Sequence, residues 1–223
     1  CDTCHTPSDP DAWRTDCTFC HGGVDNATGA PPEGISDETS AAETSFPPHT
    51  THVEETTLKS AFDCVQCHTK PTDIFSTGHL FVGDTTPGVA DLRFVAGLSP
   101  AATWNGTNGT CSNLYCHGNG RGNNGTVTVD SDVTCGTCHS VRSSGEAGWE
   151  RMSEPHDDHL EEGVQCWECH GDTVDNRDQI VDKTLHVDGD VDLELVSTMS
   201  RVGDTCTGSC HGEGHAGRRW EDD

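Results

Sequence analysis

The alternation of apolar and polar residues predicts only short strands. Apolar residues recur at every second position in DLRFV (91–95), TVTVD (126–130) and VDLELV (191–196). Most of the remaining chain is rich in Gly, Pro, Ser, Thr, Asn and Asp, and segment 25–45 has the composition of a surface loop. The pattern therefore predicts a few short strands embedded in coil.

Helical signals are equally brief. Two histidine pairs, His49 with His52 and His156 with His159, have the i, i+3 spacing that places both side chains on one face of a helical turn. The segment LKSAFDCVQCH (58–68) is also predicted to form a short helix. Each helical turn could therefore present its two histidines to two neighbouring binding sites.

The composition cannot supply an ordinary hydrophobic core. Of 223 residues only 31% are apolar, and that share includes all fourteen cysteines. Ordering the backbone costs about 1–2 kcal/mol per residue, which so little apolar surface cannot offset. The chain is therefore either disordered or organised around something other than its own side chains.

The charge excludes several classes of partner. The formal net charge is −26 at pH 7, so nucleic acids and anionic membranes would repel the chain. No apolar run approaches the ~20 residues that span a bilayer. The acidic run Asp188–Glu194 lacks the EF-hand spacing for calcium and is predicted to be a solvated turn and strand. The sequence begins at Cys1, and we expect that an export signal preceded it.

The cysteines carry the chemistry. All fourteen fall in seven pairs, and a histidine follows each pair directly. Five pairs have two intervening residues: Cys1 and Cys4 with His5, Cys17 and Cys20 with His21, Cys64 and Cys67 with His68, Cys135 and Cys138 with His139, and Cys166 and Cys169 with His170. Two pairs are stretched: Cys111 and Cys116 with His117, and Cys206 and Cys210 with His211.

C-x-x-C-H is the attachment signature of c-type haem. Two thiols one turn apart can add to the two vinyl groups of a porphyrin, and the next imidazole then faces the iron. A zinc ribbon also uses paired cysteines, but two pairs share one metal and no histidine is needed after each pair. A disulfide framework would explain an even cysteine count but not seven histidines at one offset. The pattern therefore predicts seven covalently bound haems c, with the motif histidines as proximal iron ligands.

The number of remaining histidines equals the number of second axial positions, one for each iron. Seven histidines lie outside the motifs: His49, His52, His79, His156, His159, His186 and His215. Seven haems need seven such ligands, so we predict that these residues are the distal ligands. Met152 and Met199 are the only methionines, and packing is the role that we expect for them.

An internal repeat organises the motifs. PHTTHVEE (48–55) and PHDDHLEE (155–162) share one pattern, and each precedes a C-x-x-C-H motif. We interpret the chain as an N-terminal haem segment, a first trihaem repeat, a linker, and a second trihaem repeat with a C-terminal tail. These parts cover residues 1–16, 17–117, 118–134 and 135–223. The two stretched motifs occupy the same slot of the repeat, which indicates that both bind haem.

The repeat leaves one haem and one histidine without an assigned ligation partner. Each unit holds three motifs and three spare histidines, so ligation can close within each unit. The haem of His5 and the side chain of His215 remain. His215 lies four residues after His211, too close along the chain to reach the opposite face of the same iron. It would serve the haem of His5, a haem of a neighbouring copy, or none.

The chain resembles the multihaem c-type cytochromes of metal-reducing bacteria. The run CSNLYCHG…CGTCHS (111–140) is similar to a C-x₄-C-H…C-x-x-C-H pattern of their exported cytochromes. Some cytochromes of this kind polymerise into extracellular filaments, or nanowires, in which a histidine of one subunit caps a haem of the next. The resemblance implies a secreted or cell-surface homopolymer with head-to-tail haem contact, and it implies that His215 ligates a neighbouring subunit's haem.

The expected fold is a multihaem cytochrome c, mostly coil with short helices and a few short strands wrapped around stacked haems. The expected function is long-range electron transfer without catalysis, because two histidines per iron leave no open site for a substrate. One alternative is a discrete soluble carrier, in which His215 caps the haem of His5 within one chain. Another is a multihaem reductase with one open haem, in which His215 is surplus.

Overall fold

The computed structural model describes residues 11–22, 26–31, 33–34, 37–40, 49–80, 82–85, 90–119, 122–128, 133–145, 148, 152, 155–195, 197–210 and 212–219. The motif of Cys1, Cys4 and His5, and the motif histidine His211, lie outside the described residues. The chain divides into two compact units. The first comprises Cys1–Thr56 and Ala61–Asp132, and the second comprises Thr57–Ser60 and Val133–Asp223.

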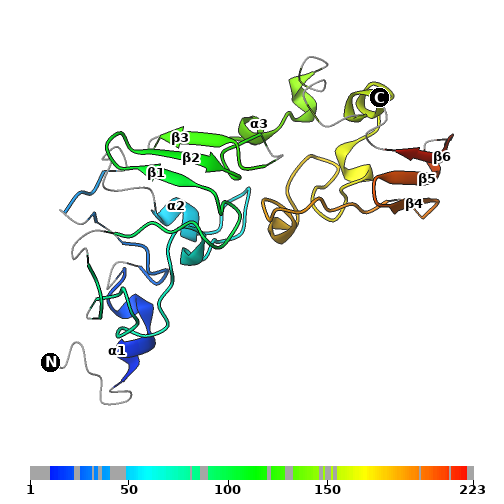
Figure 1. Cartoon of the computed structure of the whole chain (residues 1–223). Coiled ribbons are helices and arrows are strands. Elements are labelled where there is room, and N and C mark those ends of the chain that lie inside the picture. The colour runs from blue at the N-terminus through cyan, green and yellow to red at the C-terminus, as the bar shows by residue number, and fades with distance from the viewer. Residues whose placement is uncertain are drawn as a thin grey trace. The chain divides into compact units, whose positions relative to one another are not determined.

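The described chain is mostly coil with short elements, which confirms the expected fold class (Figure 1). The α-helices are α1 (Ala12–Thr15), α2 (His49–Val53), α3 (Cys135–Cys138) and α5 (His156–Glu161). Single 3₁₀ turns cover Cys17–Phe19, Cys64–Gln66, Arg142–Ser144, Cys166–Glu168 and Lys183–Leu185. The two helical turns predicted from the histidine spacing are α2 and α5.

The first unit contains a three-stranded antiparallel sheet in the order β1-β2-β3. Its strands are β1 (Thr103–Asn105), β2 (Thr110–Leu114) and β3 (Gly125–Thr128). The side chain of Asn105 accepts a hydrogen bond from the amide of Thr107 (3.0 Å), which closes the turn between β1 and β2. The stretched motif begins on this sheet, because Cys111 lies on β2, whereas Cys116 and His117 follow its end.

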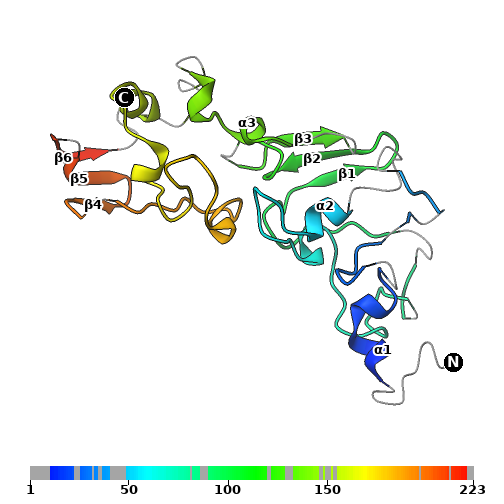
Figure 2. The same cartoon turned by 180° about the vertical axis from the view of Figure 1, so that it is seen from behind.

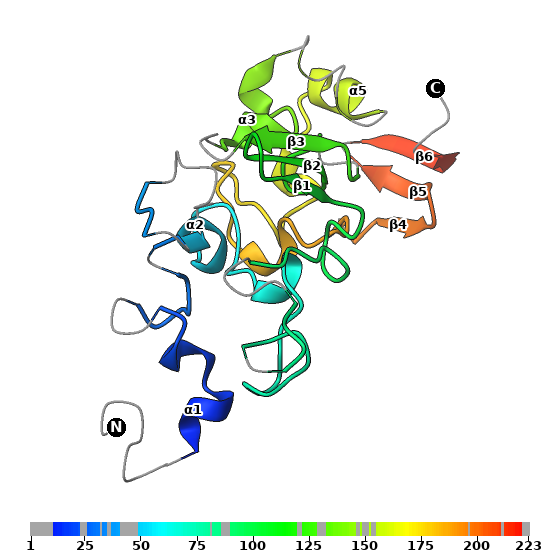
Figure 3. The same ribbon diagram turned by 60° about the vertical axis from the view of Figure 1, so that its left-hand side comes forward.

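The second unit contains another three-stranded antiparallel sheet, in the order β4-β5-β6 (Figures 2 and 3). Its strands are β4 (Met199–Val202), β5 (Thr205–Cys210) and β6 (Glu213–Arg219). Val202 on β4 and Thr205 and Thr207 on β5 favour pleated backbone, whereas β6 contains no β-branched residue. Both cysteines of the last motif lie on β5, so each stretched motif is associated with a sheet rather than with a helical turn.

Three sequence predictions of secondary structure were wrong. Segment 58–68 forms only the 3₁₀ turn Cys64–Gln66, because the amide of Phe62 bonds to the carbonyl of His52 (3.1 Å) instead of to its own preceding turn. Segments 91–95 and 191–196 form no strand among their described residues. Each instead bonds to a C-x-x-C-H turn: the amide of Arg93 donates to Cys67, and that of Glu194 donates to Cys169.

The apolar core is thin. Among the described residues the buried apolar side chains are Ala30, Ile74, Phe94, Leu114, Leu160 and Val164, and no large side chain is fully buried. Val95 and Val191, from the segments predicted as strands, are 74% and 72% exposed. No helix in the described part of the chain has the length and apolarity needed to cross a bilayer.

We predict that the chain does not fold cooperatively without haem. Its buried apolar side chains are too few to offset the entropy of ordering the backbone. The chain should be produced without haem attachment, kept reduced, and heated while its near-ultraviolet circular dichroism is followed. We expect the haemless chain to give a weak signal with no sigmoidal transition. The haem-loaded protein should instead unfold in a single sigmoidal transition. A cooperative transition of the haemless chain would show that side chains alone supply the core.

Candidate haem-binding sites

Three C-x-x-C-H motifs share one backbone conformation. In each, the motif histidine amide donates to the carbonyl of the first cysteine at 2.9 Å: His21 to Cys17, His68 to Cys64, and His170 to Cys166. Asp16 and Asp63 cap the first two turns, since each carboxylate accepts a bond from the amide two residues later (3.0 Å). The turn brings both cysteines and the histidine onto one short loop.

The fourth described C-x-x-C-H motif is helical instead. Cys135–Cys138 form α3, and Thr134 and Thr137 exchange the reciprocal bonds of a capping box at its start. His139 follows the helix in extended conformation. The two cysteines are again about one turn apart, as attachment to one porphyrin requires.

The twelve described histidines form six pairs, each within one unit. The separations of the ring centres are 6.2 Å for His21–His79, 6.3 Å for His49–His68, 6.1 Å for His52–His117, 6.3 Å for His139–His186, 6.4 Å for His156–His170 and 5.9 Å for His159–His215. Five of these pairs join a motif histidine to a spare one. The sixth joins two spare histidines.

The separations fit an iron between two imidazoles. A metal–imidazole bond is about 2 Å long and a ring nitrogen lies about 1 Å from the ring centre, so two ligands across one metal have centres about 6 Å apart. The interplanar angles range from 11° to 87° while the separations stay between 5.9 and 6.4 Å. Rings that point edge-on at one shared atom can rotate about their common axis without changing this separation. Direct ring stacking would instead tie the angle to the distance.

Backbone carbonyls fix the orientation of six of these rings. A carbonyl oxygen can only accept, so the Nδ1–H of each ring donates: His68 to Asp91, His79 to Ile74, His139 to Ser140, His159 to Pro155, His170 to Asp192 and His186 to Leu58. This bond leaves the lone pair on Nε2. Iron-ligating histidines have this arrangement, in which an outer partner orients the ring and raises its basicity.

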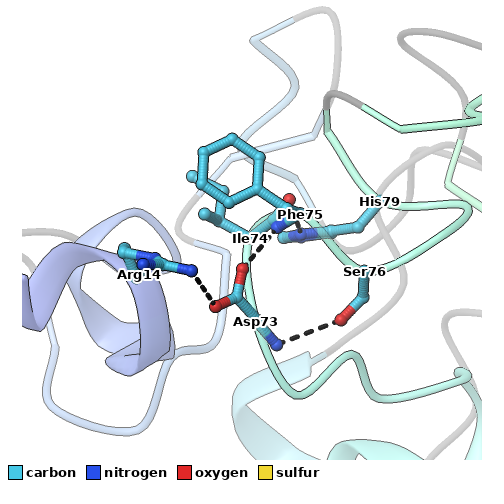
Figure 4. Close-up of polar contacts among 6 residues, drawn as sticks. All are labelled: Arg14, Asp73, Ile74, Phe75, Ser76 and His79. Atoms are coloured by element: carbon cyan, nitrogen blue, oxygen red, sulfur yellow. Dashed lines mark hydrogen bonds and ion pairs between the residues drawn. The ribbon is translucent and has the colours of Figure 1, made fainter.

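The support of His79 shows how a loop is held for this purpose (Figure 4). Asp73 pairs with Arg14 of α1 (3.0 Å) and also accepts a bond from the amide of Phe75 (2.7 Å). The Arg14 guanidinium lies 5.4 Å from the ring centre of Phe75, within the range of a cation–π contact. This turn presents the carbonyl of Ile74 to Nδ1 of His79 (3.3 Å).

In both units a thiol of the stretched motif lies near the second thiol of a C-x-x-C-H motif. Burial raises the pKa of Cys67 to about 11, and the Cys111 thiol and then the Cys64 thiol add to the shift. Burial likewise raises the pKa of Cys169 to about 11, with Cys210 as the next largest cause. Each stretched motif therefore adjoins a C-x-x-C-H motif of its own unit, the one at Cys64 in the first unit and the one at Cys166 in the second.

The surroundings of two motif histidines favour the neutral form that binds iron. Burial lowers the pKa of His21, and the nearby His79 and then His68 lower it further. Burial also lowers the pKa of His117, with His52 as the second cause. A neutral imidazole keeps the lone pair that a metal needs, so these residues fit a haem iron.

The structure also shows pairings that the sequence did not specify. His49 and His52 share helix α2 but face different motif histidines, His68 and His117. His156 on α5 faces the equivalent motif histidine, His170. The sequence left His215 for a haem outside the trihaem units, whereas the structure places its ring opposite His159.

A family model described as "Geobacter CxxxxCH...CXXCH motif" matches residues 110–139. No curated protein and no solved structure matches the chain. The matched segment contains the first stretched motif and the motif that follows it. Together with the repeated C-x-x-C-H signature, the match supports a multihaem c-type cytochrome that holds haem c covalently and carries electrons.

We predict that His49→Ala and His156→Ala each open one haem. Loss of one axial ligand leaves a five-coordinate iron that binds carbon monoxide when reduced. Spectroscopic titration of each reduced, haem-loaded variant should show about one more carbon monoxide site per chain than the parent protein. Thr51→Ala and Asp158→Asn are matched controls, because both residues are exposed on the same helices. An unchanged count in both histidine variants would contradict the ligand assignment.

Proposed function

We propose that this protein conducts electrons over long range along seven closely spaced bis-histidine haems. The six histidine ring pairs with centres 5.9–6.4 Å apart are the observation that supports this proposal most strongly. Haem c supplies one-electron exchange at an iron whose two axial positions stay filled. The histidines of the chain would keep both axial positions of each iron filled. Filled axial positions suit electron transfer better than substrate binding.

The spacing of the sites supports transfer between haems within each unit. Helix α2 presents His49 and His52 one turn apart to two different motif histidines. Helix α5 presents His156 to the motif histidine His170 and His159 to His215. Side chains three residues apart on a helix lie about 5–6 Å from each other. Two ligand pairs therefore adjoin in each unit, and the neighbouring thiols of Cys67 and Cys111 agree with this.

The proposed assembly is an extracellular or cell-surface filament in which haem sites of successive copies meet head to tail. The resemblance of the motifs to those of filament-forming cytochromes supports it. A discrete soluble carrier would have the same haem sites without the polymer. A reductase would need one haem with an open axial position.

We predict that the unsubstituted protein binds no carbon monoxide when it is fully reduced. Every haem in the proposed conduit has two protein ligands, so no iron offers a free position. The measurement is a spectroscopic titration of the reduced, haem-loaded protein at neutral pH. Uptake of about one equivalent per chain would instead favour the reductase.

We predict that filament length depends on ionic strength. The charge of −26 opposes self-association, and the Debye length falls from ~30 Å at 0.01 M salt to ~8 Å at 0.15 M. Electron microscopy and light scattering of the oxidised protein should show filaments at 0.15 M that shorten or dissociate at 0.01 M. Single particles at both salt concentrations would favour the discrete carrier.

A further inference from the structure

One pair of histidine rings in the second unit is crossed, whereas the equivalent pair in the first unit is nearly parallel. The ring planes of His139 and His186 differ by 87°, with ring centres 6.3 Å apart. The ring planes of His21 and His79 differ by 26°, with ring centres 6.2 Å apart. Both pairs occupy the same positions of the predicted repeat. The crossed arrangement therefore needs a cause that the first unit lacks.

The two equivalent rings are oriented by carbonyls from unrelated segments. Nδ1 of His79 donates to the carbonyl of Ile74 (3.3 Å), five residues earlier in the same loop. Nδ1 of His186 donates instead to the carbonyl of Leu58 (2.5 Å), 128 residues earlier in the chain. Leu58 belongs to the segment Thr57–Ser60, which is part of the second unit although the chain on both sides of it is part of the first. We call Thr57–Ser60 the inserted segment.

The facing ring is fixed as well. Nδ1 of His139 donates to the carbonyl of Ser140 (2.8 Å), and Ser140 is buried. Each Nδ1–H bond lies in the plane of its ring, so it resists rotation of that ring about the bond from Nε2 to a metal. With both rings held in this way, the angle between their planes is set by the protein.

The backbone beside His186 supports this conclusion. His186 is extended, but the next residue, Val187, has a φ of +63°. A β-branched residue rarely adopts this left-handed conformation, and such strain persists only where the surroundings impose it. Leu80, which follows His79 in the first unit, is not among the described residues with positive φ. The position of His186 is therefore imposed by its contacts and not by the local preference of its own loop.

The angle between two axial imidazoles has a direct electronic effect. In a low-spin ferric haem, each imidazole plane raises the energy of one of two iron d orbitals by π donation. Parallel planes act on the same orbital and separate the two in energy, whereas crossed planes act on both and leave them close together. A haem with crossed ligands therefore has a strongly anisotropic paramagnetic signal, which differs from the rhombic signal of a haem with parallel ligands.

We infer that the inserted segment is a positioning element for the haem attached to Cys135 and Cys138. Its Leu58 carbonyl holds His186 crosswise to His139, and this makes that haem electronically distinct from its equivalent in the first unit. The inference rests on the proposed function, in which the ring pairs are axial ligand pairs. It also means that a ligand of the second unit depends on a segment from the first half of the sequence.

The test removes the single hydrogen bond and keeps the ligand. His186 should be replaced by Nδ1-methylhistidine, which retains Nε2 for the iron but cannot donate to Leu58. Electron paramagnetic resonance of the oxidised, haem-loaded protein should show loss of a strongly anisotropic signal, and the reduced variant should gain no carbon monoxide site. The same replacement of His79 is the matched control, and it should leave that signal unchanged.

A second variant tests whether the inserted segment acts through His186. Leu58→Gly combined with Ser60→Gly loosens the segment and retains the charge of Lys59. It should weaken the same signal, and adding Nδ1-methylhistidine at position 186 should cause no further loss than that replacement alone. Thr57→Ala, at an exposed position of the segment, should have no effect.

The outcomes separate this inference from the proposed function. An anisotropic signal that survives Nδ1-methylhistidine at position 186 would overturn the inference, and so would a His186→Ala variant that gains no carbon monoxide site. Carbon monoxide uptake by the unsubstituted protein would count against the conduit alone, because the anisotropic signal is compared between variants. If the glycine variant loses haem by intact mass, the Nδ1-methylhistidine variant decides the matter.

Discussion

The proposed ligation, in which two imidazoles meet across one iron, would organise this chain. Each histidine pair joins segments that are distant in sequence, as His21 and His79 do in the first unit and His139 and His186 do in the second. Covalent attachment and two axial bonds restrict a loop much as a metal restricts a small metal-dependent domain. Such bonds would provide the long-range order that the few buried apolar residues of the described chain could not provide.

The two halves of the predicted repeat share the contacts that orient the histidine rings, although their secondary structure differs. Asp91 and Asp192 occupy equivalent positions, and their carbonyls accept from Nδ1 of His68 and His170 at 2.8 and 2.7 Å. A backbone carbonyl is offered by any residue, so this support can persist while side chains change. The last motif differs in its local structure, since both of its cysteines lie on β5, and the neighbouring His215 on β6 faces His159.

The sequence predicted the histidine-bearing helices because an i, i+3 spacing reports directly on which side chains share a face. It failed at 91–95 and 191–196, where alternation resembles a strand but the backbone bonds to a motif turn. It did not indicate β5, whose cysteines are spaced for attachment rather than for an apolar face. It also could not pair His159 with His215, because that contact depends on the register of the hairpin and not on motif spacing.

The most direct measurement is a map of the iron positions in the haem-loaded protein, by iron-edge anomalous diffraction or high-resolution electron cryomicroscopy. The account predicts one iron midway between the rings of each of the six histidine pairs, including His52–His117 and His159–His215. An iron whose two axial ligands come from different pairs, or a ring pair with no iron between its members, would contradict it.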